Sequence, residues 1–330
     1  MNTVHAMTGS PFQGAMLEKL KAFLSSCALD YDAGIQYSVV IIDHDEMIAT
    51  GSLDGNTIKC VAVSAAHQGE DLTAQIITHL VREAFSRNQR HLMLYTKPQN
   101  QYLFSPLGFH PIIRTADCLL MENKRNGLQS FLEKLTFPPI AEGTIGCIIA
   151  NCNPFTKGHR YLIETASREC AYVHLFILSE DKSTFSANDR LSMASEGCKD
   201  LENVFVHPTG PYMISSSTFP GYFLKDKGKA ASVHCEMDIR LFAEKIAPYF
   251  HITRRYVGTE PFCPVTYAYN TQLKQLLPGY GIDLIEVERL GLDNSVISAS
   301  RVREMLACGS DADLAELLPQ TTLQYLNHSK

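Results

Sequence analysis

Hydrophobic and polar positions form two different patterns, one in the first part of the chain and one in the second. Over residues 1–135 the pattern predicts a helix at 16–24, followed by strands at 38–43, 46–51 and 58–63. A strongly periodic helix is expected at 72–85, then strands at 91–95 and 119–122 and a connecting helix at 127–134. Successive strands followed by a helix and another strand are typical of an α+β domain with a mixed sheet.

From Thr144 onward, predicted strands alternate with predicted helices. The strands are expected at 145–150, 172–178, 204–207, 255–257 and 284–287, and the helices at 159–169, 188–200, 237–247, 271–277 and 299–308. This alternation predicts βαβ units and a parallel sheet, in which ligands bind beyond the carboxyl ends of the strands. Because Phe137-Pro138-Pro139 breaks the connecting helix, we expect domains at 1–135 and 144–330, joined by a linker at 136–143.

Composition narrows the class of protein. The chain has 330 residues, of which 45% are hydrophobic and 19% charged, a globular balance that excludes a disordered chain. No apolar run reaches the ~18 residues of a membrane span, and residues 1–13 do not read as a secretory signal, so we expect a cytoplasmic protein with no membrane partner. The net charge of −6 argues against nucleic acid as a partner. Ten scattered cysteines without a CxxC pair indicate reduced, buried thiols.

The loop after the first strand of the second block has the chemistry of a phosphate site. It runs from Asn151 to His159 and opens a helix, whose free backbone N–H groups and positive dipole end attract anions. Gly158 permits close backbone approach, and Thr156 and His159 add a hydroxyl and an imidazole three residues apart. The competing interpretation is that Gly158 ends a turn and His159 caps the helix, and this loop alone does not separate the two.

A second segment of the same kind lies near the C-terminus. Residues 297–303 read Ile-Ser-Ala-Ser-Arg-Val-Arg and again follow a strand and open a helix. Ser298 and Ser300 can bond phosphate oxygens, and Arg303 lies one turn into the helix. Two such segments, each at a strand–helix junction, favour a nucleotide site over helix capping alone.

These segments resemble the (His/Thr)-x-Gly-His and Ile-Ser-x-Ser/Thr-x-x-Arg signatures of the nucleotidyltransferase superfamily. The longer stretches 151–164 and 217–225 are similar to the citrate lyase ligases, and the resemblance covers essentially the whole chain. It implies a Rossmann-like, doubly wound parallel sheet in the second domain. The family's usual Asp-Pro is Asn153-Pro154 here, so a carboxylate is missing, which we expect to spare an anionic substrate a repulsion.

The resemblance also assigns roles to individual residues. It implies catalytic roles for His159, Thr156, Lys182 and Arg303. It implies ATP contacts for Asn153, Pro154, Phe155, Gly158, Arg190, Gly258, Glu260, Ile297, Ser298 and Ser300. Mg²⁺ would be held by the ATP phosphates and by no protein ligand.

The implied reaction is that of an AMP-forming acid–thiol ligase. ATP and acetate would give acetyl-adenylate and pyrophosphate, and the acetyl group would pass to a thiol. That thiol belongs to the phosphoribosyl-dephospho-CoA group on the acyl-carrier (gamma) subunit of citrate lyase, which becomes active. Acetate is already ionised at pH 7, so the first step needs positioning and charge neutralisation more than a base.

The first domain resembles the GCN5-related acetyltransferases. Residues 68–73, the periodic helix after them and the turn Leu107-Gly108-Phe109 carry this resemblance. Asp71 and Thr73 stand where that family has small residues against a coenzyme A pyrophosphate, and a carboxylate there would be repulsive. Both interpretations of this domain, as a CoA-type binding domain and as a structural or docking domain, remain open.

Several alternatives share parts of this pattern. An adenylyltransferase that joins AMP to a phosphate acceptor such as phosphopantetheine would carry both phosphate segments, and a transferase using acetyl-CoA would use the first domain. Cys152 is interpreted as a packing residue rather than a covalent acetyl carrier. Candidates for the acceptor channel are Tyr212, Ser215, Ser216 and Phe219.

Overall fold

The computed structural model describes residues 4–137, 142–180, 183–213, 219–224, 227–260, 263–292, 295–309 and 314–328. Packing divides the chain into two units, of which one comprises residues 1–130 with 218–237 and the other residues 131–217 with 238–330. This division differs from the contiguous one that the sequence suggested. The segment before residue 238 belongs with the first unit because the Tyr222 side chain packs into that unit's core and the Cys118 thiol lies 3.6 Å from the Met237 sulfur.

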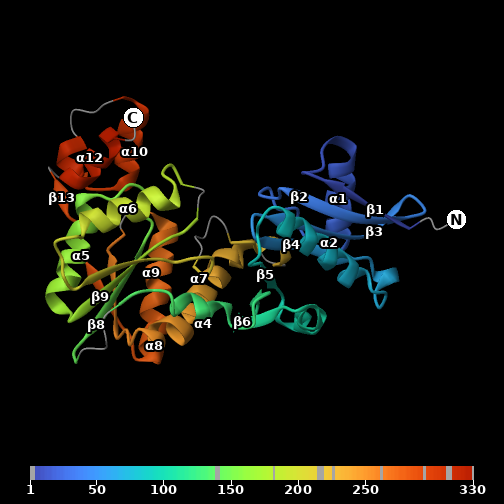
Figure 1. The fold of residues 1–330 in the computed structure, drawn as a ribbon, viewed down its shortest axis with the longest axis horizontal. Coiled ribbons are helices and arrows are strands. Elements are labelled where there is room, and N and C mark those ends of the chain that lie inside the picture. The colour runs from blue at the N-terminus through green and yellow to red at the C-terminus, as the bar shows by residue number, and fades with distance from the viewer. Residues whose placement is uncertain are drawn as a thin grey trace. The chain divides into compact units, whose positions relative to one another are not determined.

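The first unit is built on a seven-stranded sheet in the order β1-β2-β3-β4-β5-β7-β6 (Figure 1). Its elements are β1 (His5–Gly9), α1 (Gly14–Ser26), β2 (Tyr37–Asp43), β3 (Glu46–Asp54), β4 (Thr57–Val63), α2 (Leu72–Ser86), β5 (Met93–Thr96), α3 (Gln101–Phe104), β6 (His110–Arg114), β7 (Leu119–Glu122) and α4 (Gly127–Leu132, which ends in the second unit). All strand pairs are antiparallel except β4 with β5.

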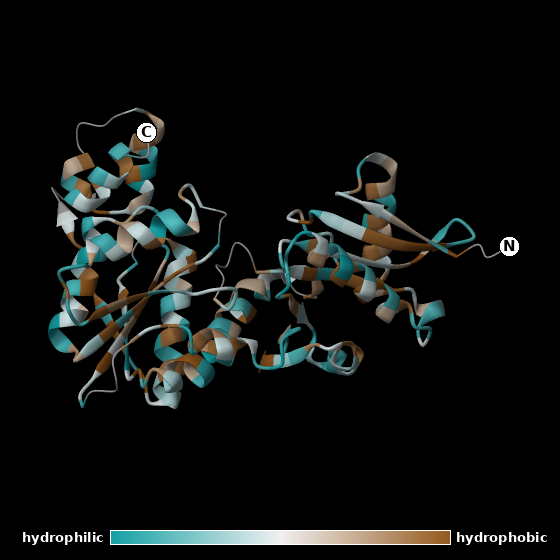
Figure 2. Cartoon of the chain, in the orientation of Figure 1, coloured by the Kyte–Doolittle hydropathy of each residue, from teal (hydrophilic) through white to brown (hydrophobic). Residues whose placement is uncertain are grey.

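The two faces of this sheet bury different helices. The periodic apolar side of α2, including Ile76 and Leu80, packs on one face against Val39 and Ile41. Leu20 and neighbouring residues of α1 form a second core with residues whose side chains point to the opposite face. Hydrophobic stretches run along these strands in Figure 2. The α+β architecture expected for this region is therefore confirmed.

The second unit contains a five-stranded parallel sheet in the order β10-β9-β8-β11-β12. Its elements are β8 (Ile145–Ala150), α5 (Lys157–Glu169), β9 (Tyr172–Ile177), α6 (Ala187–Gly197), β10 (Val204–Pro208), α7 (Ala230–Leu241, which begins in the first unit), α8 (Ala247–Tyr249), β11 (Arg254–Gly258), α9 (Pro264–Leu276), β12 (Asp283–Val287), β13 (Gly291–Leu292), β14 (Ser295–Val296), α10 (Ala299–Ala307), α11 (Leu314–Leu317) and α12 (Gln320–His328). The doubly wound parallel sheet expected from the sequence is confirmed.

Helices cover both faces of the parallel sheet. Ile163 of α5 and Met193 of α6 pack on one face against Val173 and Leu175 of β9. On the other face, the Arg255 guanidinium of β11 lies over the ring of Phe242, in a π-helical turn that follows α7. The strand order reverses direction between β8 and β11, so the topological switch point lies between these two strands.

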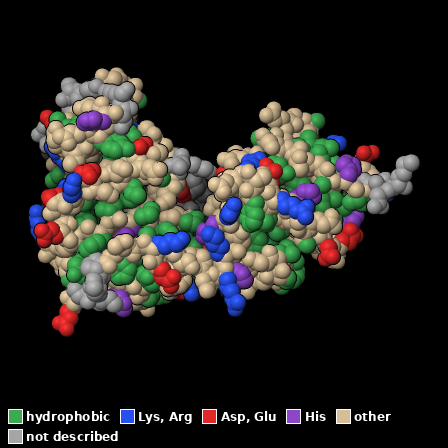
Figure 3. Space-filling model, viewed as in Figure 1, with side chains coloured by type: hydrophobic (Ala, Val, Ile, Leu, Met, Phe, Trp, Pro, Cys, Tyr) green, Lys and Arg blue, Asp and Glu red, His purple; other side chains and the backbone are tan. Residues whose placement is uncertain are grey.

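Some element boundaries differ from the sequence prediction. Helix α9 begins at Pro264 and not at residue 271 as predicted. The prediction missed the first two turns because they expose Val265 and Tyr267 and therefore lack an apolar stripe. Strand β1 was not predicted because His5–Gly9 forms an exposed edge with no buried face. On the face seen in Figure 3, acidic and basic side chains are interspersed. None of the described helices is long and apolar enough to cross a membrane.

Candidate functional site

A cavity of about 490 Å³ opens at the switch point of the second unit. Strands β8 and β11 are paired only at Gly146 with Arg254 and Cys147 with Arg255, and they separate toward their carboxyl ends. The cavity is lined there by both strands and by the first residues of α5 and α10. Two helix N-termini therefore face one cavity, which is the arrangement that favours anions.

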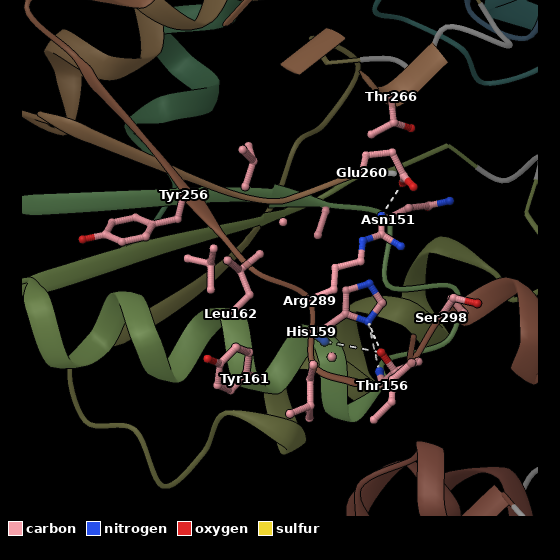
Figure 4. A pocket seen from close by; sticks show the side chains of 18 of the residues that line it. Asn151, Thr156, His159, Tyr161, Leu162, Tyr256, Glu260, Thr266, Arg289 and Ser298 are labelled. Atoms are coloured by element: carbon pink, nitrogen blue, oxygen red, sulfur yellow. Dashed lines mark hydrogen bonds and ion pairs between the residues drawn. The ribbon is translucent and has the colours of Figure 1, made fainter. Parts of the chain in front are cut away.

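The N-terminus of α5 is fixed by a reciprocal capping arrangement. The Thr156 hydroxyl accepts the backbone N–H of His159 at 3.3 Å, and the His159 Nδ1 accepts the backbone N–H of Thr156 at 3.0 Å. A backbone N–H only donates, so Nδ1 carries no proton and the neutral ring holds its proton on Nε2. The dashed lines in Figure 4 mark these bonds beside the Arg289 side chain. His159 is thereby a hydrogen-bond donor through Nε2.

The surroundings keep this imidazole neutral. Burial, with a smaller contribution from the positive charge of Arg289, lowers the pKa of His159 to about 4. The ring of Phe155 stacks beneath it, with centroids 5.9 Å apart and planes 20° apart. Phe155 is fully buried, so it fixes the orientation of the histidine ring from below.

The N-terminus of α10 supplies the second wall. The Ser298 hydroxyl caps the helix by accepting the N–H of Arg301 at 3.2 Å. One turn on, Arg303 donates to the backbone oxygen of Asn153 at 2.7 Å and to the Ser300 hydroxyl at 3.0 Å. Arg303 thereby ties the α10 segment to the loop that leads into α5. The two phosphate-type segments, about 150 residues apart in sequence, are joined in this way.

Arg289 is a cavity residue that the sequence analysis did not select. It follows β12, donates through Nε to the Thr259 carbonyl at 2.7 Å and forms an ion pair with Glu260. Figure 4 shows its side chain next to the His159 ring, with Glu260 on its far side. Its position after a parallel strand was the available signal, because side chains that follow such strands gather at the same edge of the sheet.

The structure brings together eight of the residues selected from the sequence. The cavity lining includes Thr156, Gly158, His159, Gly258, Glu260, Ile297, Ser298 and Ser300. A Cβ on Gly158 would lie 3.1 Å from the Ile297 carbonyl oxygen, so the glycine permits close approach of the two segments. Lys182, Ser215 and Ser216 lie outside the described residues.

Other selected residues lie beside the cavity and hold its loops. The lining does not include Asn153, Pro154, Phe155, Arg190 or Arg303. The Asn153 side chain is 7% exposed and accepts the N–H of Phe185 at 3.1 Å, so its oxygen is used between loops. Asn153 therefore does not line the cavity where an anionic substrate would meet it.

Arg190 joins the loops that follow β8 and β9. The side chain is fully buried. Its nitrogens donate to the carbonyl oxygens of Phe185, Asn151, Leu178 and Glu180 and to the side-chain oxygen of Asn151. Because these acceptors are all loop groups of the protein, Arg190 is a positioning residue.

Cys152 and two acceptor-channel candidates have packing positions. Burial raises the pKa of the Cys152 thiol, which is 1% exposed and belongs to the core beneath the cavity, consistent with a packing role. Tyr212 is buried against Phe131. Phe219 belongs to the first unit, where its ring meets the edge of Tyr95.

The first unit has its own cavity of about 280 Å³, between β4 and β5. These parallel strands are paired only at Thr57 with Met93 and Ile58 with Leu94, and they separate beyond that point. Tyr222 lines the gap and its hydroxyl donates to the Tyr95 carbonyl at 3.4 Å. Part of the space between the two strands is therefore occupied by the chain itself.

The second unit thus belongs to the Rossmann-like α/β class, with a cavity at the switch point of its sheet. A family model described as the citrate lyase ligase C-terminal domain matches residues 145–326. Curated relatives include the citrate (pro-3S)-lyase ligases of Haemophilus influenzae (42% identity, 94% of this chain and 95% of the relative), Klebsiella pneumoniae (38%, 94% and 92%) and Escherichia coli K12 (37%, 94% and 90%). The chain belongs to the citrate lyase ligase family and is an enzyme of the ligase class.

Comparison with solved structures finds partial likenesses. Escherichia coli ElaA matches 37% of this chain and 99% of its own length, with a TM-score of 0.33 and 15% identity. An acyl-CoA N-acyltransferase from Pseudomonas aeruginosa matches 38% of this chain and 100% of its own, with a TM-score of 0.32 and 13% identity.

Proposed function

We propose that this enzyme is an ATP-dependent ligase that activates citrate lyase by acetylating its acyl-carrier subunit. Acetate would first be adenylated with release of pyrophosphate, and the acetyl group would then pass to the thiol of the subunit's CoA-like prosthetic group. The names of the family's curated members support citrate lyase as the object of the reaction. The convergence of two helix N-termini and a neutral His159 on one cavity carries the nucleotide part of the proposal.

The cavity residues suit the binding of a triphosphate. Backbone N–H groups at the start of α5 and α10, the hydroxyls of Ser298 and Ser300 and the Nε2–H of His159 are all donors, and phosphate oxygens are acceptors. Mg²⁺, when bound, would neutralise phosphate charge and would be held through the phosphate oxygens. Arg289 adds one positive charge to this wall, partly balanced by Glu260.

In the first half-reaction, a carboxylate oxygen of acetate attacks the α-phosphorus and the bond to pyrophosphate breaks. Acetate is ionised at pH 7, so no proton has to be removed. The attack increases negative charge on the phosphate oxygens, where a donor fixed in advance is most effective. His159 supplies such a donor because Thr156 holds its tautomer and Phe155 holds its ring plane.

In the second half-reaction, the carrier thiol attacks the acetyl carbonyl of acetyl-adenylate. The carbon–oxygen bond to AMP breaks, the thioester forms and the thiol proton is released. AMP is a good leaving group, so this step also depends mainly on positioning.

ATP–pyrophosphate exchange tests the proposal directly. We expect exchange that depends on acetate, and we expect His159→Asn to reduce its rate by about 10²-fold, the usual effect of losing a positioned donor. His251→Asn is the matched control, because His251 is exposed after α8 and its φ of 53° suits asparagine. Exchange that stays absent with acetate and carrier protein but occurs with dephospho-CoA would overturn the ligase proposal in favour of an adenylyltransferase.

A further inference from the structure

Arg255 is a buried cation on the wall of the cavity whose hydrogen-bonding capacity is largely unused. It lies on β11, where it is 2% exposed, and it is part of the cavity lining. Its neighbour Tyr256 points to the opposite face of the sheet, where its hydroxyl donates to Glu169. The Arg255 guanidinium instead lies 4.5 Å from the ring centroid of Phe242, and its Nη2 donates to the Tyr269 hydroxyl at 3.3 Å.

These contacts satisfy only one of the three guanidinium nitrogens. Nε and Nη1 are buried, and neither has a hydrogen-bond partner in the part of the chain that the structure describes. A buried donor without an acceptor is costly, more so when it is charged, and most buried donors in proteins are satisfied. The Arg255 guanidinium therefore has donors left over for the acceptor atoms of a ligand.

The charge of Arg255 is also without a direct counter-ion in the described residues. The Asp238 carboxylate accepts the hydroxyl of Tyr269 and attracts the guanidinium from beyond ion-pair distance. A guanidinium out of water is stable when paired with an anion, and its planar fork of donors matches two oxygens of a carboxylate or of a phosphate. In the proposed function, the ATP phosphates bind at the N-termini of α5 and α10, so Arg255 is left for a different anion.

The rest of the nearby lining fits a small acid with an apolar end. Ile149 of β8 and Val257 of β11 contribute aliphatic side chains to the same cavity. We infer that Arg255 binds the carboxylate of the acid substrate, a short-chain monocarboxylate, through its guanidinium group. This inference rests on the proposed function, because it assigns the acid subsite of the adenylation reaction. Arg255 is accordingly a substrate-binding residue that also selects anions over neutral acyl compounds.

The test is acetate-dependent ATP–pyrophosphate exchange in the full-length enzyme and in two variants of this residue. We expect Arg255→Met to raise the KM for acetate by about 10- to 100-fold, the range for losing a charge-assisted hydrogen bond, while the KM for ATP changes less than about twofold. Arg255→Lys keeps the charge without the guanidinium geometry and should give an intermediate KM for acetate. Arg254→Met is the control, because Arg254 is the adjacent strand residue and does not line the cavity.

Each outcome separates this inference from the proposed function. Acetate-dependent exchange in the wild type with an unchanged KM for acetate in Arg255→Met would overturn the inference and leave the ligase proposal standing. A raised KM for ATP instead of acetate would assign the guanidinium to the nucleotide and also overturn it. Absence of exchange in the wild type would count against the proposed function, and acetate binding measured by NMR in wild type and Arg255→Lys would then test Arg255 alone. If circular dichroism shows Arg255→Met to be unfolded, Arg255→Lys and Arg254→Met decide the question.

Discussion

At the scale of single residues, His159 combines a fixed tautomer with a pKa of about 4. Its ring is therefore neutral from pH 6 to 8.5, and protonation of Nδ1 would break its bond with the Thr156 N–H. We expect the rate of pyrophosphate exchange at saturating ATP and acetate to show no ionisation of His159 in this range. A rate profile with a pKa near 6.5 that disappears in His159→Asn would contradict the prediction.

Arg190 offers a stability prediction at the same scale. Replacing it with lysine leaves several of its five acceptors, in the loops after β8 and β9, without a donor. We expect Arg190→Lys to lower the free energy of unfolding by about 3 kcal/mol or more, since a buried charged network is broken. Urea unfolding measures the loss, and Arg168→Lys, on the exposed side of α5, should change stability by less than about 0.5 kcal/mol. Equal effects of the two substitutions would show that the network is unimportant.

Sequence patterns identified His159, Thr156, Ser298 and Ser300 because local spacing at a strand–helix junction determines where these side chains lie. They did not identify Arg255 or the positioning role of Arg190. A buried arginine that bonds loop carbonyls and one that faces a cavity have the same local pattern. Their difference depends on which distant segments surround them, and that information is tertiary.

At the scale of elements, α6 packs against the loop before α5 through a glycine. A Cβ on Gly197 would lie 2.3 Å from the ring of Phe155, which is fully buried and stacks on His159. We expect Gly197→Ala to destabilise the protein by about 1–3 kcal/mol through overpacking and to reduce the exchange rate by tilting the histidine ring. Gly279→Ala is the control, because a Cβ there meets nothing within 4 Å. A thermal melt and an exchange rate of Gly197→Ala that match those of the control would refute this account.

Helix α2 was predictable because its buried residues repeat at the helical period, and strand β9 was predictable because it is a short, continuously buried apolar run. Strand β1 and the first turns of α9 were not predictable, because their side chains are exposed. Strand β1 is defined only by its backbone pairing with β2, and the first turns of α9 only by the backbone of the helix that they begin. The membership of residues 219–224 in the first unit depends on Tyr222 packing against residues far away in sequence.

At the scale of the whole molecule, the second unit buries two histidines against each other on adjacent strands of its parallel sheet, His174 on β9 and His207 on β10. The His174 Nδ1 and His207 Nε2 lie 3.0 Å apart, and both rings contact Phe176 and Phe250. Burial lowers the pKa of His174 to about 3, with a smaller contribution from His207, and burial alone lowers the pKa of His207 to about 4. Both rings are therefore neutral in the folded protein at pH 7.

This pair makes the stability of the protein depend on pH in a defined direction. A histidine whose pKa is lower when folded stabilises the fold above its unfolded pKa of about 6.5, and that stabilisation is lost as the pH falls toward 4. Each of the two contributes up to about 1.4 kcal/mol per pH unit within this window. We therefore expect the free energy of unfolding to fall steeply from pH 6.5 to 5, where most carboxylates are still ionised.

A double substitution isolates the contribution of the pair. His174→Leu with His207→Leu removes both partners together, so it should cost little at pH 7.5, and it should flatten the loss of stability between pH 6.5 and 5. His207→Leu alone leaves the buried Nδ1 of His174 without its partner and should cost about 1–3 kcal/mol at pH 7.5. His159, whose pKa is also lowered, remains in every variant. The double variant should therefore keep a dependence of the unfolding free energy on pH that has the same sign as in the wild type but is smaller. Urea unfolding at pH 7.5, 6.5, 5.75 and 5 measures these differences, and parallel curves for wild type and double variant would show that the pair does not set the acid limit of stability.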